Sequence, residues 1–271
     1  MDAATPLTAA EPPAQRAVGE GRVRLGRGGL ERLHQAGSAK VRFCATQDGV
    51  REAVLLNTAG GLTGGDRFAW SVALAQGARG RVVTQACEKV YRSTGPPANV
   101  DVALEVAAGA SLEWLPQETI LFEGACLRRR FDVRIAPGGR LLAVEAVILG
   151  RAAMGETRIE ARLDDRWRVQ WGERLIFADN LRLDLGPATT GRPAALRDAC
   201  AFALVLLVAE DAEARLDAVR ESLGAQGGAS AWDGKLVCRI AAPDGLALRR
   251  AITAVSGVLR AGAAAPRLWT V

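Results

Sequence analysis

The sequence holds few of the residues that usually build metal and nucleophilic sites. It contains a single histidine, His34, and five cysteines that are scattered along the chain. Stable zinc and nickel sites favour several imidazole or thiolate ligands, and the sequence has no closely spaced CxxC pair. We therefore expect no tightly bound cofactor, and no catalytic triad is visible. An odd, scattered set of cysteines fits a reducing cytoplasm.

Lysine and aromatic residues are also scarce. Only three of the 35 basic residues are lysines, and aromatic residues make up 5% of the chain. The arginines are interleaved with acids and do not cluster beside aromatics, which disfavours a nucleic-acid groove. No apolar run reaches the length of about 18 residues that a transmembrane helix needs. The N-terminus lacks signal-peptide features. We expect a cytoplasmic protein that binds no membrane, with a disordered lead-in over residues 1–20 and a folded region over 21–271.

A period of two dominates the first two-thirds of the sequence and predicts half-buried β-strands. It occurs in DVALEV (101–106), RFDVRI (130–135), RIEARL (158–163), RWRVQW (166–171) and LRLDL (181–185). Breaks rich in glycine and proline separate these runs in the manner of turns. Long helical patterns are absent before about residue 200. The expected fold is mainly β.

Three segments of the chain resemble one another: LAQGARGRVVTQ (74–85), VAAGASLEWLPQ (106–117) and IAPGGRLLAVEA (135–146). Their starts lie 32 and 29 residues apart. Such a period is typical of stacked β-units that share one core, as in a layered or helically wound β-sheet, although similar turns also recur by chance. A true repeat would bring Gln85, Gln117 and Glu145 to similar levels, with Glu88 and Glu118 just beyond.

The last third changes character. ACAFALVLLVA (199–209) and KLVCRIAA (235–242) are apolar strand candidates. A helix is expected in DAEARLDAVRESLG (211–224), stopped at Gly224, and a second one after Pro243 and Asp244. The expected order is strand–helix–strand–helix, so the few α-helices are concentrated here. GPATTGRP (186–193) is the candidate loop before this part.

The segment NTAGGLTGGD (57–66) places four glycines in six residues, just before Asp66. A nucleotide-binding P-loop needs Lys and Ser or Thr after the last glycine, whereas Asp66 and Arg67 stand there. A dinucleotide fingerprint needs a following helix, but FAWSVALA (68–75) is typical of a strand. A turn between two strands fits better. Asp66 either caps that turn or faces a solvent path or a metal.

Two further segments combine charge with aromatic residues. In TQACEKVYRS (84–93), a strand would put Glu88 and Arg92 on one face and Lys89 and Tyr91 on the other. This segment is either a solvated edge with weak ion pairs or a charged patch at a partner surface. In EWLPQETILFEG (113–124), Pro116 interrupts a strand. That segment is either a bulged core strand or a sheet edge that docks a partner.

Four motifs, in this order and spacing, resemble the urease accessory protein UreD family, called UreH in some organisms. They are LNTAGGLTGGDRF, TQACEKVYRS, LEWLPQETILFEGA and EAVILGRAAMGE, and the C-terminal APRLW is also similar to the family's ending. The resemblance implies a mostly β, layered or helically wound fold and a non-catalytic chaperone for nickel delivery to urease. It implies a hetero-oligomeric complex with UreF, with UreG bound through UreF, and with apo-urease. It also implies a water-filled route for nickel in transit.

The positions of these motifs suggest candidate residues for both roles. Hypothetical nickel-transit carboxylates are Asp66, Glu88, Glu118, Glu145 and Glu156. Hypothetical partner-binding residues are Lys89, Tyr91, Arg92, Trp114, Phe122 and Arg151. One rival hypothesis is an enzyme in which the first three carboxylates act as acid–base groups. The other is a β-rich protein-interaction module without a metal role.

Overall fold

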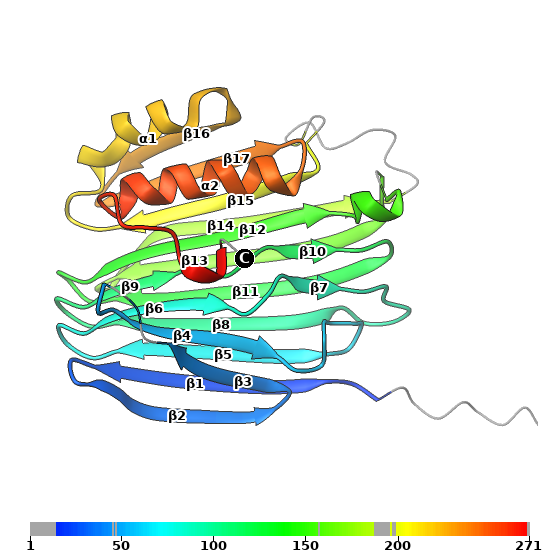
Figure 1. Ribbon diagram of the computed structural model, residues 1–271, viewed down its shortest axis with the longest axis horizontal. Coiled ribbons are helices and arrows are strands. Elements are labelled where there is room, and N and C mark those ends of the chain that lie inside the picture. The colour runs from blue at the N-terminus through cyan, green and yellow to red at the C-terminus, as the bar shows by residue number, and fades with distance from the viewer. Residues whose placement is uncertain are drawn as a thin grey trace, which may run out of the picture.

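The structure is a computed structural model that describes residues 15–44, 46, 48–156, 158–186, 196 and 199–269. Its strands lie one above another largely in chain order, with the two α-helices in front of them (Figure 1). Of the expected lead-in, residues 1–14 lie outside the described residues, and the first strand begins at Val18. Most of the expected loop 186–193 also lies outside them.

One sheet has seven strands in the order β14-β13-β11-β8-β5-β1-β2. Their bounds are β1 Val18–Gly26, β2 Gly29–Gly37, β5 Arg67–Leu74, β8 Ala98–Val106, β11 Ala125–Ile135, β13 Ala161–Trp171 and β14 Arg174–Leu185. The inner neighbours β1, β5, β8, β11 and β13 pair in parallel. The outermost strands β2 and β14 pair antiparallel and end the sheet on both sides. We call this sheet the seven-stranded sheet.

The second sheet has the main order β16-β17-β15-β12-β9-β6-β4-β3, and the short strands β7 and β10 extend it beside β12. Its strands are β3 Ala39–Cys44, β4 Arg51–Asn57, β6 Arg79–Thr84, β7 Glu88–Val90, β9 Ser111–Trp114, β10 Thr119–Leu121, β12 Arg140–Leu149, β15 Ala201–Val208, β16 Gly227–Trp232 and β17 Lys235–Ala242. The helices are α1 Leu216–Leu223 and α2 Gly245–Leu259, with short 3-10 turns at Ala152–Met154, Glu213–Arg215, Gly224–Gln226 and Arg267–Trp269. We call this sheet the ten-stranded sheet.

The internal repeat of the sequence is a repeat of the structure. The residues that open the three similar segments, Leu74, Val106 and Ile135, are in register on β5, β8 and β11. Each is followed by a turn that carries the chain to the other sheet. The glycines of these turns, Gly77 and its counterparts Gly109 and Gly138, have φ of +67°, +65° and +76°, which glycine adopts readily. The chain is therefore a β-solenoid whose coils stack on one another.

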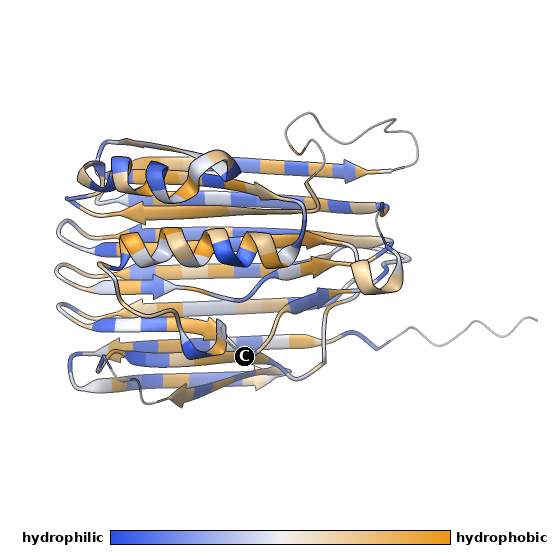
Figure 2. Cartoon of the chain, turned by 45° about the horizontal axis from the view of Figure 1, so that its top comes forward, coloured by the Kyte–Doolittle hydropathy of each residue, from blue (hydrophilic) through white to orange (hydrophobic). Residues whose placement is uncertain are grey.

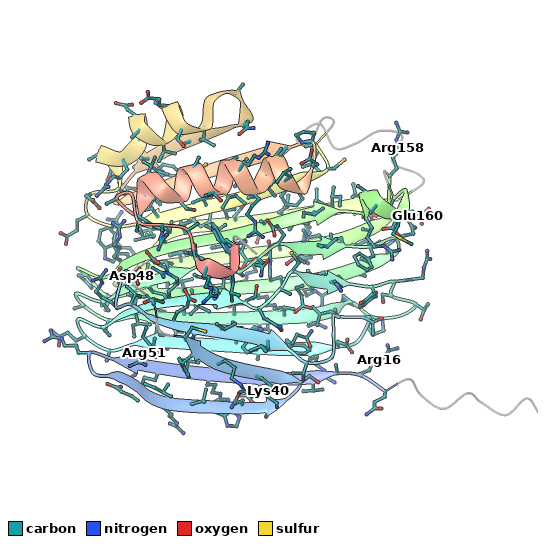
Figure 3. All side chains as sticks on the ribbon, in the orientation of Figure 1. Arg16, Lys40, Asp48, Arg51, Arg158 and Glu160 are labelled. Carbon is teal, nitrogen blue, oxygen red and sulfur yellow. The ribbon has the colours of Figure 1, made fainter. Side chains whose placement is uncertain are left out.

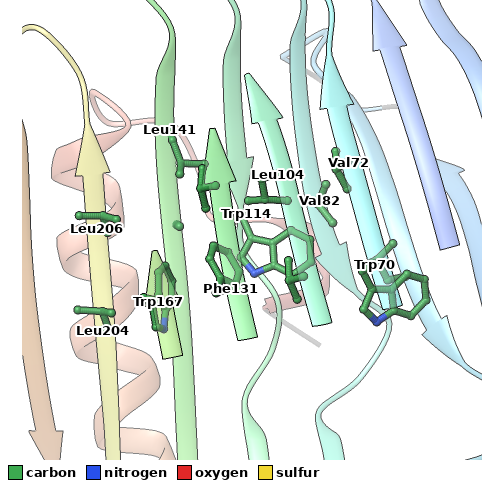
Figure 4. Packing of buried hydrophobic residues seen from close by; sticks show 14 of the residues in the cluster. Trp70, Val72, Val82, Leu104, Trp114, Phe131, Leu141, Trp167, Leu204 and Leu206 are labelled. Atoms are coloured by element: carbon green, nitrogen blue, oxygen red, sulfur yellow. The ribbon is translucent and has the colours of Figure 1, made fainter. Parts of the chain in front are cut away.

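Two hydrophobic cores hold the layers together. The first lies between the two sheets, where Phe131 stacks on Trp167 with ring centroids 4.0 Å apart and meets the edge of Trp114 at 5.6 Å (Figure 4). The second lies between the ten-stranded sheet and the helices. Hydrophilic and hydrophobic residues alternate along many of the strands, as Figure 2 shows, because one face of these strands is buried and the other is exposed.

The expected mainly β fold with helices in the C-terminal third is confirmed. Two local expectations differ from the structure. The run RIEARL becomes a strand only from Ala161 onward, and the C-terminal order is strand–helix–strand–strand–helix because β16 precedes β17. No helix within the described ranges is long and apolar enough to cross a membrane.

Candidate functional site

Four loops gather at one end of the solenoid, which we call the loop end. They follow β4, β7, β10 and β12, and backbone contacts join them in chain order. Leu62 bridges to Val90, the Ser93 amide donates to the Gly124 carbonyl, and the Gly150 amide donates to the Leu121 carbonyl. Figure 3 shows Arg16 at this end together with Arg158 and Glu160, whereas Asp48 lies toward the opposite end. Motifs far apart in sequence therefore meet here.

The glycine-rich segment forms the loop between β4 and β5, as expected for a turn between strands. Its glycines serve close packing. A Cβ on Gly61, whose φ is +144°, would lie 2.4 Å from the ring of Tyr91. A Cβ on Gly64 would lie 2.0 Å from the Ser93 hydroxyl. Both distances are far inside van der Waals contact, so side chains on the next loop exclude other residues from these positions.

Asp66 caps this loop and lines a cleft. Its Oδ1 accepts a hydrogen bond from the Ala17 amide and its Oδ2 accepts one from the Thr63 amide, both at 2.8 Å. The carboxylate is buried at the wall of a cleft of about 510 Å³ between the start of β1 and the glycine-rich loop. Arg16 and Tyr91 also line this cleft. Asp66 therefore caps the turn, and its buried side chain also borders the cleft.

Glu88 is the first residue of β7, and its side chain points between the sheets. In register it aligns with Thr119 and Val147, and Val147 belongs to the core between the sheets. Its Oε1 accepts a hydrogen bond from the side-chain amide of Asn57 at 3.1 Å. Burial raises the pKa of Glu88 to about 7, the hydrogen bond from Asn57 opposes this, and the negative charge of Asp66 adds to it. The side-chain amide of Asn57 also donates to the Gly61 carbonyl, so it links Glu88 to the glycine-rich loop.

Deeper in the core, Arg129 joins two carboxylates from different strands. Its Nε donates to Asp165 on β13 at 3.1 Å, and its Nη1 forms an ion pair with Glu145 on β12. The indole of Trp114 donates to Glu145 at 2.8 Å, and Thr119 lies 3.5 Å from the guanidinium. Burial raises the pKa of Glu145, which the charge of Arg129 counteracts. One guanidinium thus faces two buried carboxyl groups.

These groups form a polar line through an otherwise apolar core. We call Asp66, Glu88, Glu145 and Asp165 the interior row. Thr119 connects its two halves, since it neighbours Glu88 in register and contacts the guanidinium that holds the inner carboxylates. The row begins at the cleft and ends between β12 and β13. Three of the predicted transit carboxylates are therefore brought together, in the order Asp66, Glu88 and Glu145.

Glu118 and Glu156 lie away from this row. Glu118 points to the outer face of the ten-stranded sheet, where Arg249 of α2 donates to it at 2.6 Å and the Cys87 thiol donates at 3.4 Å. Glu156 lies in the loop after β12 and accepts hydrogen bonds from the backbone amide and the guanidinium of Arg151, both at 3.0 Å. Each of these carboxylates therefore has a structural ion-pair partner.

The predicted partner-binding residues mostly lie at the loop end. Tyr91 meets Phe122 edge-on with centroids 5.1 Å apart, and the guanidinium of Arg151 lies 4.2 Å above the same ring. We call these three residues the aromatic–arginine cluster. Lys89 and Arg92 are exposed beside it. The prediction that Trp114 binds a partner is wrong, because this side chain is buried in the core.

Sequence reasoning missed two members of this network, Arg129 and Asp165. Each occupies an inward position of an alternating strand, next to Phe131 and Trp167 respectively, where an apolar residue is expected. That break in the alternation was the available signal. Among the residues that the structure describes, no three histidines, cysteines or acids are grouped so that they could hold a metal. The carboxylates are spread along a line and do not converge on one point.

A family described as "UreD urease accessory protein" matches residues 17–270. The chain belongs to the UreD family. It is 48% identical over 271 residues to a urease accessory protein UreD of Rhizobium leguminosarum bv. trifolii (strain WSM2304), covering 98% of this chain and 99% of that protein. It is 46% identical over 269 residues to a UreD of Brucella suis (strain ATCC 23445 / NCTC 10510), covering 96% of both. UreD membership therefore rests on nearly the whole chain.

Proposed function

We propose that this UreD-family chain is a non-catalytic scaffold in urease maturation, and that Ni²⁺ passes through it along the interior row. The observation that carries this proposal is a line of carboxylates that starts at the cleft with Asp66 and continues inward through Glu88 to Glu145. Nickel is here a cargo and not a resident cofactor. Oxygen ligands taken one or two at a time bind a divalent cation loosely enough to release it.

The charge of the row supports a cationic cargo. Around Arg129, two carboxyl groups share one guanidinium, so full ionisation leaves one negative charge in excess. An isolated buried charge is unfavourable, and a passing cation offsets it. Glu88 must lose its proton to bind a metal, so nickel binding there is coupled to proton release.

The aromatic–arginine cluster supports a docking role for the loop end. Tyr91 is exposed and borders the cleft, and Lys89 and Arg92 are exposed next to it. Tyrosine and arginine are enriched at protein interfaces because they combine apolar area with hydrogen bonds. We assign this end to a partner in nickel delivery, with UreF bound directly, UreG through UreF, and apo-urease as the recipient, in the cytoplasm.

The second hypothesis is that the chain is a protein-interaction module without a metal role. It is favoured by the structural bonds of every predicted transit carboxylate, including the two backbone hydrogen bonds of Asp66. The enzyme hypothesis is less well supported. It needs Asp66, Glu88 and Glu118 in one site, whereas Glu118 points away from the interior toward α2.

Reconstitution tests this proposal. The chain is co-purified with UreF and UreG, and urease activity is measured after apo-urease is incubated with nickel and bicarbonate, with and without the chain. We expect the chain to co-purify with UreF, to be required for full activation, and to show no turnover alone. Full activation in its absence would contradict the proposal, and turnover by the isolated chain would favour the enzyme hypothesis.

A further inference from the structure

The outer face of the seven-stranded sheet carries a dense set of arginines over β11, β13 and β14. On these strands every second residue points away from the core, and the two helices of the described residues, α1 and α2, pack on the ten-stranded sheet instead. The arginines at outward positions are Arg128, Arg130 and Arg134 on β11, Arg162, Arg166 and Arg168 on β13, and Arg182 on β14. We call this surface the arginine face.

The local acids leave the arginine face with a net positive charge. Three aspartates share it, so its seven arginines exceed its acids by four charges. Asp164 lies 3.9 Å from both Arg128 and Arg182, and Asp184 lies 3.5 Å from Arg162. These pairs are exposed and stabilise the fold little. On the neighbouring β8, Glu105 lies 3.8 Å from Arg134 and Asp101 aligns with Arg130, so the described residues still leave a surplus of two positive charges.

Arg130 and Arg166 lie at the centre of the arginine face. They are direct neighbours in the register of β11 and β13, both are exposed, and neither has an ion pair within the described residues. Asp101 of β8 neighbours Arg130 on the other side without forming an ion pair. Like charges opposite one another on adjacent strands destabilise a sheet. An external anion would relieve this repulsion.

We propose that the arginine face binds the acidic surface of a folded protein partner. The 11 residues of β11 extend over about 36 Å at about 3.3 Å per residue, which is longer than any small anion. Guanidinium groups pair with carboxylates in a bidentate geometry. The interleaved aspartates match a protein surface of mixed charge and would repel a polyphosphate. No aromatic side chain points outward from the described parts of these strands to stack on bases.

This surface is distinct from the loop end, and the inference does not depend on nickel transfer. Its test uses the full-length protein and a double charge reversal, Arg130→Glu with Arg166→Glu. The matched control is Arg32→Glu with Arg250→Glu, which changes two other exposed arginines on β2 and α2 and alters the net charge equally. Circular dichroism and the Tm confirm that both variants fold.

Binding is measured with poly-L-glutamate as the carboxylate probe, and with a DNA duplex as the competing class. We expect the wild-type protein and the control to bind poly-L-glutamate with affinities within about twofold, and the double reversal to bind at least about tenfold more weakly at low salt. Equal binding by the double reversal and the control would overturn the proposal. Tighter binding of the duplex than of poly-L-glutamate at this face would overturn it in favour of a nucleic acid.

The physiological partner is then sought among apo-urease and the UreF–UreG pair, with the same variants. Weaker association of the double reversal with one of them, in a salt-dependent manner, supports the arginine face as its docking surface. Urease activation separates this inference from the proposed function. If the wild-type chain does not support urease activation, the proposed role in nickel delivery is wrong. The binding of poly-L-glutamate still decides whether the arginine face binds acidic surfaces.

Discussion

Charged side chains at inward positions distinguish this solenoid from a purely structural one. Arg129, Glu145 and Asp165 lie between aromatic and aliphatic side chains in the space between the sheets. Removing two charges from water costs free energy that their attraction only partly returns. An apolar set of similar volume would stabilise the fold at least as well. Their presence therefore fits the proposed nickel route better than a purely stabilising role.

This interpretation predicts a contrast between a single and a triple replacement. Arg129→Met leaves two buried carboxyl groups unpaired, and we expect it to lower the free energy of unfolding by about 3–5 kcal/mol. Adding Glu145→Leu and Asp165→Leu should recover most of that loss, yet leave urease activation low because the inner row is gone. Urea denaturation and activation assays measure the two effects. Normal activation by a stable triple variant would show that these charges are dispensable for transfer.

Glu88 predicts a specific dependence of stability on pH. Its pKa is about 7 in the folded chain against an ordinary value of 4.5, so the folded state holds this proton more tightly than the unfolded state. Its contribution is fully present below about pH 4.5 and is lost as the pH rises through about 7. Glu88→Gln cannot ionise, so its stability relative to the wild type should increase by about 1–3 kcal/mol between pH 5 and pH 8.

Urea denaturation of both proteins at the two pH values measures this difference. Asp66→Asn serves as a related control, since it removes the neighbouring negative charge and should lower the pKa of Glu88. A stability difference between Glu88→Gln and the wild type that stays constant with pH would contradict the buried placement of Glu88.

At the scale of elements, the sequence predicts most of the strands, and its internal repeat also predicts that they stack in coils. Alternation correctly indicated β8, β11, β13 and β14, because one face of each is buried. β2 gave no such signal, since nearly all of its residues are exposed. β16 begins with two glycines and lacks an apolar period. A strand can therefore be predicted from the sequence only where the burial of one face produces an alternating pattern.

The sequence predicts the positions of the strands better than it predicts the face of the sheet to which each candidate side chain points. Val82 aligns with Trp114 and Ala143, and Glu88 aligns with Thr119 and Val147. Between these two aligned positions, the first segment (Val82 to Glu88) has five intervening residues, the second (Trp114 to Thr119) has four and the third (Ala143 to Val147) has three. The coils therefore bulge differently, and equivalent positions in sequence point to different faces. For this reason Glu118 faces α2 while Glu145 faces the core.

The contact between α2 and the ten-stranded sheet gives a prediction for an element. Glu118 is buried and holds Arg249 of α2, whose side chain is 19% exposed. Glu118→Ala leaves this arginine without its carboxylate, so we expect a loss of about 2–4 kcal/mol in stability and faster hydrogen exchange in α2. Because Glu118 lies off the interior row, urease activation per folded molecule should stay near the wild-type value. A selective loss of activation would place Glu118 on the route after all.

At the scale of the whole molecule, the solenoid offers three separate features. The loop end presents the aromatic–arginine cluster, the interior row leads inward from the cleft, and the arginine face covers one side of the seven-stranded sheet. Parallel coils hold all three in fixed relation, since each coil is hydrogen-bonded to the next along its strands. A rigid scaffold of this kind suits the assembly of several proteins around one path.

The most direct test of this account is urease activation by variants that obstruct the row at its mouth. Thr63 lines the cleft and its amide donates to Asp66, so Thr63→Trp places a large ring in the opening. Glu88→Gln removes the next carboxylate, and Glu156→Gln is the matched control because Glu156 lies off the row.

Each variant is co-purified with UreF and assayed with apo-urease, nickel and bicarbonate, and the nickel content of urease is measured. The account predicts intact complexes throughout, with loss of activation and of nickel transfer for Thr63→Trp and Glu88→Gln but not for Glu156→Gln. Normal nickel transfer by Thr63→Trp and Glu88→Gln in intact complexes would contradict a route along these residues.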